Sequence, residues 1–467
     1  MGLPSGNDFS LSEIRSRWRD RGGSAVGILH SVSNCRPAAL FKGCRRLFLY
    51  TALALSSGCG GHPKDVLLPV ADTSRGSSRV DMLIATTRAL STNRGEMFTG
   101  ERALAPAFAD ITVSIPPASV RKVGDVAWPK RLPSNPATDF ATLKADELSR
   151  EQAKAWLNAA VRKSPDGSAF VFIHGFNNRF EDSVYRFAQI VHDSGVHSAP
   201  VLVTWPSRGS LLAYGYDRES TNYTRNALEK LFQYLADDKE IKEVSILAHS
   251  MGNWLALEGL RQMAIRNGGL PAKFKNVMLV APDVDVDVFR SEIVDMGKQH
   301  PRFTLFVSRD DRALAFSRRI WGDIPRLGSI DPEQAPYKEE LEANKIAVID
   351  MTKVKAGDSL HHSKFAESPE IVQLIGRRIS EGQTLTDSRV GLGDRLIAGT
   401  TGAAAAAGSA AGLILAAPVA AVDPDTRDHY ADHLASMTGQ TSGQQKTAQR
   451  CVSNTAAPQG RACAVAR

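Results

Sequence analysis

The stretch VSILAHSMGNWLALEGL, residues 244–260, decides the fold of this chain. A short apolar run leads into Ser250, and apolar residues then recur every third position from Trp254, which is typical of a helix. A strand, a sharp turn and a helix in this order are typical of a nucleophile elbow. The nucleophile there is strained and needs small neighbours two positions away on each side, which Ala248 and Gly252 provide. Such a pentapeptide also occurs in ordinary turns, so its surroundings must decide.

Short apolar runs, several of them followed by an amphipathic helix, continue this pattern over residues 78–382. Residues 171–173 and 277–280 are continuously apolar, as a strand buried on both faces requires. Residues 111–115 alternate instead, which predicts an antiparallel edge strand with one solvent-facing side. The pattern predicts an α/β fold, with a mostly parallel, doubly wound sheet and helices on both faces. The strand candidates are Met82–Ala85, Ile111–Ile115, Ala169–Ile173, Pro200–Thr204, Val244–Ala248, Val277–Val280, Phe303–Val307 and Ile346–Ile349.

Composition and charge exclude several classes of protein. The 467 residues are 43% hydrophobic and 23% charged, a globular balance that excludes collagens, coiled-coil rods and wholesale disorder. Five cysteines are too few for a disulfide framework. The net charge is +7, but residues 1–46 carry +5 of it, so no nucleic-acid partner is expected for the rest.

Residues 1–60 contain a basic arm and a segment that resembles a bacterial lipoprotein signal. Lys42, Arg45 and Arg46 precede nine apolar residues, too few to span a bilayer, and small residues lead to Cys59. Ser56 stands where such signals usually have leucine, so the pattern fits export better than lipidation, and a buried strand or helix is the alternative. Since a signal near residue 42 is late, we also expect the true start to lie downstream, leaving out residues 1 to about 40.

The C-terminal part, residues 383–467, differs in composition from the sheet domain. Residues 61–77 also differ from it and are predicted to form a linker. Residues 396–422 carry no charge and are long enough to span a membrane, but their Ala and Gly content and Pro418 also fit a low-complexity tail. Lipidation at Cys59 or this apolar segment would give membrane association. We therefore expect the bacterial cell envelope, with a periplasmic catalytic domain, and a cytoplasmic location is the alternative.

Chemical groups gather beyond the carboxyl ends of strands in open α/β sheets. After residues 171–173 comes His174-Gly175-Phe176-Asn177, where a His-Gly turn can aim the N–H of Phe176 at the site. The N–H of Met251 is the second expected oxyanion donor. We expect the His174 side chain to bond the backbone rather than act as a base.

The acid and the base should follow the serine in that order. Asp311, after residues 303–307, fits the acid best, with Asp310, Asp283 and Asp285 as alternatives. Past the last strand candidate, His361 and His362 are the two histidines of the sheet domain that lie C-terminal to the acid.

Metal and cofactor signatures are missing from the sheet domain. Residues 78–382 contain no cysteine and no H-x-x-x-H spacing, and the pair His429 and His433 lies in the polar tail. No phosphate loop or dinucleotide turn follows a strand, so no metal and no cofactor is expected. An apolar acyl pocket, or an equally acceptable packed loop, would involve Trp205, Leu211, Leu212, Tyr214 and Tyr216.

The stretch from Val80 to Ile379 resembles a bacterial α/β-hydrolase family known as a domain of unknown function (DUF900-like). The matching text is DMLIATTR at 81–88, ITVSIPP at 111–117, HGFN at 174–177, TWPS at 204–207, AHSMGN at 248–253, APD at 281–283, SRDDRAL at 308–314 and HS at 362–363. The resemblance implies an α/β-hydrolase fold and a serine hydrolase with Ser250, Asp311 and His362, and its His-Ser pair favours His362 over His361. It fixes no substrate.

Taken together, these residues predict a serine hydrolase that cleaves a small-molecule carboxylic ester through an acyl-enzyme on Ser250. A non-catalytic envelope binding or scaffold protein on the same fold is the alternative, since fold alone does not prove turnover. An acyltransferase would use the same three residues.

Overall fold

The computed structural model describes residues 63–71, 76–355 and 357–380. The predictions for residues 1–60, including Cys59, and for residues 383–467, including the apolar segment 396–422, lie outside these ranges. Within them, no helix is both long enough and apolar enough to cross a membrane.

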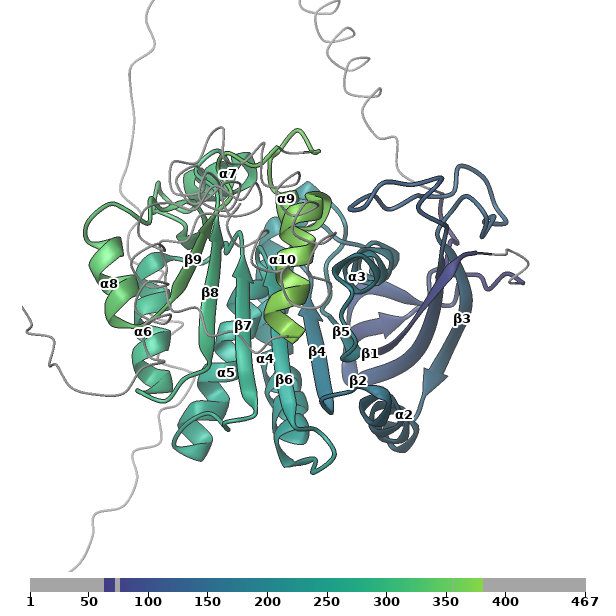
Figure 1. Cartoon of the computed structure of the whole chain (residues 1–467), viewed down its shortest axis with the longest axis horizontal. Coiled ribbons are helices and arrows are strands. Elements are labelled where there is room, and N and C mark those ends of the chain that lie inside the picture. The colour runs from purple at the N-terminus through teal and green to yellow at the C-terminus, as the bar shows by residue number, and fades with distance from the viewer. Residues whose placement is uncertain (1–62, 72–75, 356, 381–467) are drawn as a thin grey trace, which may run out of the picture. The chain divides into compact units, whose positions relative to one another are not determined.

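A nine-stranded sheet forms the centre of the domain, in the order β3-β2-β1-β5-β4-β6-β7-β8-β9 (Figure 1). The pairs β1–β2 and β2–β3 are antiparallel, whereas every pair from β1–β5 to β8–β9 is parallel. This mostly parallel sheet confirms the predicted α/β fold. The strands are β1 Ser78–Leu90, β2 Phe98–Ile115, β3 Ala141–Leu148, β4 Ser168–Ile173, β5 Ala199–Thr204, β6 Glu243–His249, β7 Phe274–Val280, β8 Arg302–Val307 and β9 Ala347–Asp350.

Helices cover both faces of the sheet (Figure 1). One core is shared with α2, α4, α5, α6 and α8, and the other with α3, α9 and α10. α7 follows the carboxyl end of β8 and contributes one fully buried apolar residue, Leu314. The helices are α2 Arg150–Lys163, α3 Phe180–Ser194, η1 Leu211–Ala213, α4 Tyr214–Asp237, α5 Gly252–Asn267, α6 Val286–Met296, α7 Arg312–Ile320, η2 Leu327–Ser329, α8 Tyr337–Ala343, α9 Lys364–Glu367 and α10 Pro369–Ser380.

Strand β4 shows why continuously apolar runs become central strands. Val171 and Ile173 pack into the core under α2, α4, α5 and α6, whereas Phe170 and Phe172 pack into the core under α3 and α10. Because successive side chains point to opposite faces, a strand with helices on both sides must be apolar at every position.

The prediction that residues 111–115 form an antiparallel edge strand with one solvent-facing side is wrong in two respects, its edge position and its solvent-facing side. They are antiparallel, but β3 pairs with β2 on its outer side and takes the edge position. The polar residues of the alternating run are buried as well: Thr112 donates a hydrogen bond to Asp81 Oδ1, and Ser114 is fully buried. The sequence of β3, ATLKADEL, is half polar and did not suggest a strand.

The described part of the segment 61–77, which was predicted as a linker, contributes two residues to the core. Val66 and Leu67 are buried in the same core as α3 and α10. The carbonyl oxygen of Val66 accepts hydrogen bonds from the hydroxyl groups of Thr142 and Tyr185, at 3.1 and 2.9 Å. Two consecutive apolar residues are thus enough to tie this segment to the sheet domain.

Candidate active site

Ser250 lies at the sharp turn between β6 and α5 and has a left-handed backbone, with φ of 53°. Such a conformation in a residue other than glycine costs of order 1–3 kcal/mol and persists only where the surroundings enforce it. Here the Ser250 N–H donates to the Val280 carbonyl at 2.9 Å, and the Asn253 side-chain amide donates to the carbonyls of Ser250 and Val280, both at 2.9 Å. The turn therefore holds a strained serine in place.

Two glycines let the backbone approach this serine closely. A Cβ on Gly252 would collide with the His174 carbonyl oxygen and lie 2.8 Å from the carbonyl oxygen of Ile173. A Cβ on Gly175 would lie 2.8 Å from the Cβ of Ser250 itself. Only glycine fits at either position, so the loop after β4 lies directly against the turn at Ser250.

The two expected oxyanion donors lie where the loop after β4 meets the turn at Ser250. Phe176 follows Gly175 and Met251 follows Ser250, and Phe176 and Ser250 line the same cavity. The hydrogen bonds among the described residues include none donated by the N–H of Phe176 or of Met251. Because backbone N–H groups near the interior are normally paired, these two are candidates to bind a ligand oxygen.

A buried network supports the loop that carries Phe176. The Arg88 guanidinium donates to the carbonyls of Asn178 and Ser207, at 2.9 and 2.8 Å. The His174 ring stacks on Trp205 at 4.9 Å, and its Nε2 accepts the Trp205 N–H at 3.1 Å. Burial and the nearby Arg88 lower the pKa of His174 well below its usual value, so the ring is neutral. The prediction that His174 bonds the backbone is confirmed.

His362 and Asp311 form a close pair beyond the ends of β8 and β9. His362 Nδ1 lies 2.6 Å from Asp311 Oδ2, and the Asp311 side chain is fully buried. The other Asp311 oxygen, Oδ1, accepts the Leu314 N–H at 2.9 Å at the start of α7. Nδ1 therefore carries the donated proton, which leaves Nε2 of His362 as the basic nitrogen.

A second histidine–aspartate pair, His361 and Asp310, is next to the first in the sequence but is more exposed and has an additional partner. His361 Nδ1 lies 2.8 Å from Asp310 Oδ2, and both side chains are about one-third exposed. Asp310 also accepts hydrogen bonds from the buried Lys364 ammonium, at 2.7 and 2.9 Å. Lys364 further donates to Ser308 Oγ and to the Met351 carbonyl. It therefore ties the loop of the acid to the loop of the histidines.

Ser250 and His362 line one cavity of about 530 Å³. Its walls include Phe172, Leu314 and Phe365, so much of the surface offered to a ligand is apolar. Within the described ranges no hydrogen bond joins Ser250 Oγ directly to the His362 ring. Catalytic hydrogen bonds are often long before a substrate is bound and tighten only in the complex.

The remaining acid candidates have other partners. Asp283 lines the cavity, but its carboxylate accepts hydrogen bonds from Tyr214 at 2.9 Å and Ser317 at 2.5 Å and pairs with Arg326. Asp285 caps the start of α6. Neither carboxylate contacts a histidine in the part of the chain that the structure describes.

Two of the five residues predicted for an acyl pocket line the cavity, and the other three do not. Leu211 and Tyr214 line the cavity. Trp205 is fully buried against His174, Leu212 points to solvent, and Tyr216 donates a hydrogen bond to the Glu101 carboxylate.

For metals, no group of three or more His, Cys, Asp or Glu side chains in residues 63–71, 76–355 and 357–380 could hold an ion.

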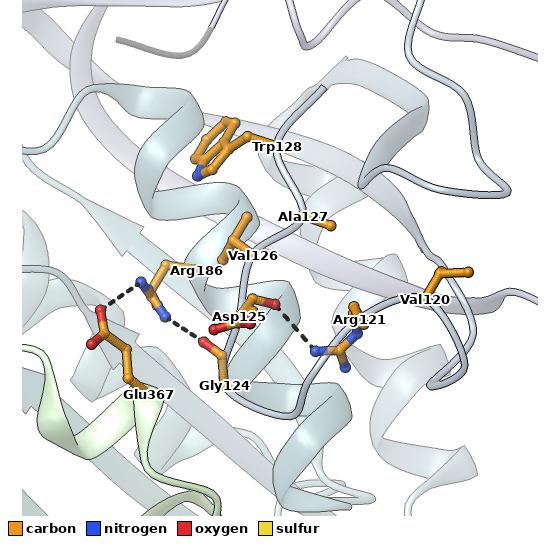
Figure 2. Close-up of a pocket in the computed structure, with 9 residues that line it drawn as sticks. All are labelled: Val120, Arg121, Gly124, Asp125, Val126, Ala127, Trp128, Arg186 and Glu367. Carbon is orange, nitrogen blue, oxygen red and sulfur yellow. Dashed lines mark hydrogen bonds and ion pairs between the residues drawn. The ribbon is translucent and has the colours of Figure 1, made fainter. Parts of the chain in front are cut away.

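A second cavity, of about 380 Å³, adjoins the first and shares Val126, Trp128 and Arg186 with it. Figure 2 shows Arg186 reaching between the Gly124 carbonyl, at 3.1 Å, and Glu367, at 3.7 Å. Arg186, on α3, thus places a charged group in the wall that the two cavities share.

Three supporting residues, Lys364, Asn253 and Arg88, had no predicted role. Arg88, Asn253 and Lys364 lie in or directly after the stretches DMLIATTR, AHSMGN and HS. A buried lysine or arginine next to a strand end requires several acceptors, but the acceptors come from distant loops, and only the tertiary structure identifies them.

The pH dependence of this site follows from His362. Burial alone would lower the pKa of the imidazole, but the Asp311 carboxylate outweighs it, so that the pKa lies above the usual 6.5. A histidine must be neutral to act as a base, so we expect kcat/KM for a neutral ester to rise with pH through a midpoint above 6.5. NMR titration of His362 should show the same midpoint, and Asp311→Asn should move it to lower pH. A midpoint at or below 6.5 in the unmodified protein would contradict this assignment.

Comparisons with known proteins agree with this fold. Residues 149–378 match the family described as an alpha/beta hydrolase of unknown function (DUF900), within the stretch of the resemblance seen in the sequence. A curated relative, the uncharacterized protein alr1448 of Nostoc sp. strain PCC 7120, is 22% identical over 317 residues, covering 53% of this chain and 83% of that protein.

Similar solved structures include a fungal esterase from Rhizomucor miehei, with 13% identity and a TM-score of 0.31 over 74% of this chain and 92% of that chain. Naproxen esterase from Bacillus subtilis has 14% identity and a TM-score of 0.22 over 45% of this chain and 82% of that chain. The family match and the sheet topology together identify the domain. It has an α/β-hydrolase fold, and residues 149–378 match the DUF900 family of unknown function.

Proposed function

We propose that this protein is a serine hydrolase that cleaves a small-molecule carboxylic ester through an acyl-enzyme on Ser250. The observation that carries the proposal is that a strained serine lines one cavity with a histidine whose Nδ1 is paired with a buried aspartate. Next to this serine are two backbone N–H groups that find no acceptor among the described residues.

In the proposed reaction, His362 Nε2 takes the proton of Ser250 Oγ as the oxygen attacks the ester carbonyl carbon. The N–H groups of Phe176 and Met251 stabilise the negative oxygen of the tetrahedral intermediate. His362 then gives its proton to the leaving alcohol, and a water molecule, activated in the same way, releases the acid from Ser250. Asp311 holds the imidazole in the required tautomer and stabilises its positive charge. No cofactor takes part in these steps.

The cavity walls support an ester with an apolar part. Phe172, Phe176 and Phe365 stand beside Ser250 and His362, and Leu211 and Phe316 extend the apolar surface outward. Burying apolar atoms against such walls stabilises the complex by about 25 cal/mol per Å² of area removed from water. Acyl transfer to an alcohol instead of water would use the same groups, and product analysis separates the two reactions.

A fluorophosphonate probe tests the proposal directly. It should label the full-length protein, and Ser250→Ala should abolish labelling because the probe reacts with an activated serine. Ser363→Ala is the matched control, since Ser363 lines the same cavity, and it should keep its labelling. Labelling that persists in Ser250→Ala would refute the assignment of the nucleophile. A folded wild-type protein that does not react with the probe would favour a binding or scaffold protein on this fold.

A further inference from the structure

Three segments that line the cavity at Ser250 carry exposed apolar side chains. Most of the surface of Leu212, Leu211 and Phe316 is accessible to solvent, with exposed fractions of 99%, 63% and 52%. Ile320, Trp321 and Leu360 are also exposed. We call these six residues, which come from η1, from the region of α7 and from the loop before His361, the mouth patch.

Hydrogen bonds join the three segments that carry the mouth patch. Trp321 Nε1 and Ser317 Oγ lie 2.9 and 3.0 Å from the hydroxyl of Tyr214, the first residue after η1. On the other side, the Arg312 N–H at the start of α7 donates to the Leu360 carbonyl at 2.9 Å. The patch is therefore one connected surface.

This surface is continuous with the catalytic cavity. Leu211, Phe316 and Leu360 belong to the mouth patch and also line the cavity that contains Ser250 and His362. A partner that covers the patch would thus face the opening of the cavity.

The charge of α7 indicates the chemistry of that partner. Residues 312–322 contain Arg312, Arg318 and Arg319 and no acidic residue. All three arginines are exposed, and Arg318 pairs with the nearest acid, Asp323. The helix buries little of itself, since Leu314 and Ser317 are its only fully buried residues. A short helix with exposed aromatic and aliphatic side chains next to arginines is typical of segments that lie in the interface of an anionic membrane.

We propose that the mouth patch docks on an anionic phospholipid surface, with Phe316 and Ile320 in the interfacial region and Arg312 and Arg319 near the headgroups. Docking brings the cavity opening to the layer in which lipid-soluble esters are concentrated. The docking step needs no turnover, so it can be tested separately from the proposed function.

Hydrogen exchange of the full-length protein with vesicles tests the docking. Vesicles of phosphatidylglycerol should slow exchange in residues 312–322 and at Leu211, Leu212 and Leu360, and vesicles of phosphatidylcholine should do so much less. Phe316→Ser together with Ile320→Ser should weaken this protection about tenfold or more, because two apolar side chains leave the interface. Ile265→Ser together with Val294→Ser, at exposed apolar positions on α5 and α6, should leave it unchanged.

Because hydrogen exchange is measured segment by segment, it distinguishes docking through the mouth patch from membrane attachment through another part of the chain. Three results would overturn the proposal: no protection with anionic vesicles, equal loss in both double variants, or protection already present without vesicles. Protection without vesicles that rises with protein concentration would assign the patch to a second copy of the chain. Protection that is independent of concentration would assign it to another segment of this chain. Ser250→Ala should dock like the wild type, so failure of docking and failure of the nucleophile assignment remain distinguishable.

Discussion

His362→Asn should lower kcat for ester hydrolysis by about 10⁴-fold or more, as expected for the loss of the base of a serine–histidine–aspartate triad. Asp311 contacts His362 through Nδ1 at 2.6 Å, whereas the other two histidines that line the cavity, His174 and His249, have no carboxylate partner among the described residues. The effect should appear in kcat rather than in KM, since the base acts on the transition state and contributes little to binding of the ester. Steady-state kinetics with a chromogenic ester measure both.

His361→Asn is the matched control. His361 is the next residue along the chain, is also paired with an aspartate, and has a positive φ of 58° that asparagine tolerates. It does not line the cavity at Ser250, so its replacement should change kcat by less than about threefold. A large loss in His361→Asn together with a small loss in His362→Asn would show that the other pair, His361 and Asp310, performs the reaction.

The comparison of these two pairs shows what the sequence could and could not predict. Chain order places a histidine after the acid. It cannot tell which of two adjacent histidines pairs with which of two adjacent aspartates. The structure separates the pairs by burial, because Asp311 is fully buried and Asp310 is partly exposed and bonded to Lys364. Lys364 reaches Asp310 across 54 positions of the chain, and a contact at that distance has no local signature in a single sequence.

The sheet was predictable where its strands are buried on both faces. Residues 171–173 and 277–280 had to be apolar at every position, and both lie in central strands. Strand β3 was not predictable, because at the edge only one side of a strand needs apolar residues, and Lys144 and Glu147 fit there as well as in a loop. Val66 and Leu67 were missed for a similar reason: two apolar residues are too short a pattern to distinguish a core segment from a linker.

Gly252→Ala should destabilise the folded domain by about 3 kcal/mol or more and lower Tm by about 6 °C or more, a large effect for one methyl group. The new Cβ would collide with the His174 carbonyl and lie 2.8 Å from that of Ile173, and backbone atoms at the end of a central strand cannot move aside as a flexible side chain can. Any shift of the His174 carbonyl also moves Phe176, two residues later. The fraction that remains folded should therefore react more slowly with the fluorophosphonate probe.

Gly215→Ala provides the control, because the same chemical change is made where nothing opposes it. Gly215 lies in the first turn of α4, is exposed, and has no heavy atom within 4 Å of the position of a new Cβ. Alanine should be neutral there or stabilise the domain by up to about 1 kcal/mol, because it restricts the unfolded chain and favours a helix. Urea unfolding of the two variants and the wild type measures the difference. If Gly252→Ala were as stable as Gly215→Ala, the loop after β4 could not lie against the turn at Ser250, and the proposed placement of the Phe176 N–H would fail with it.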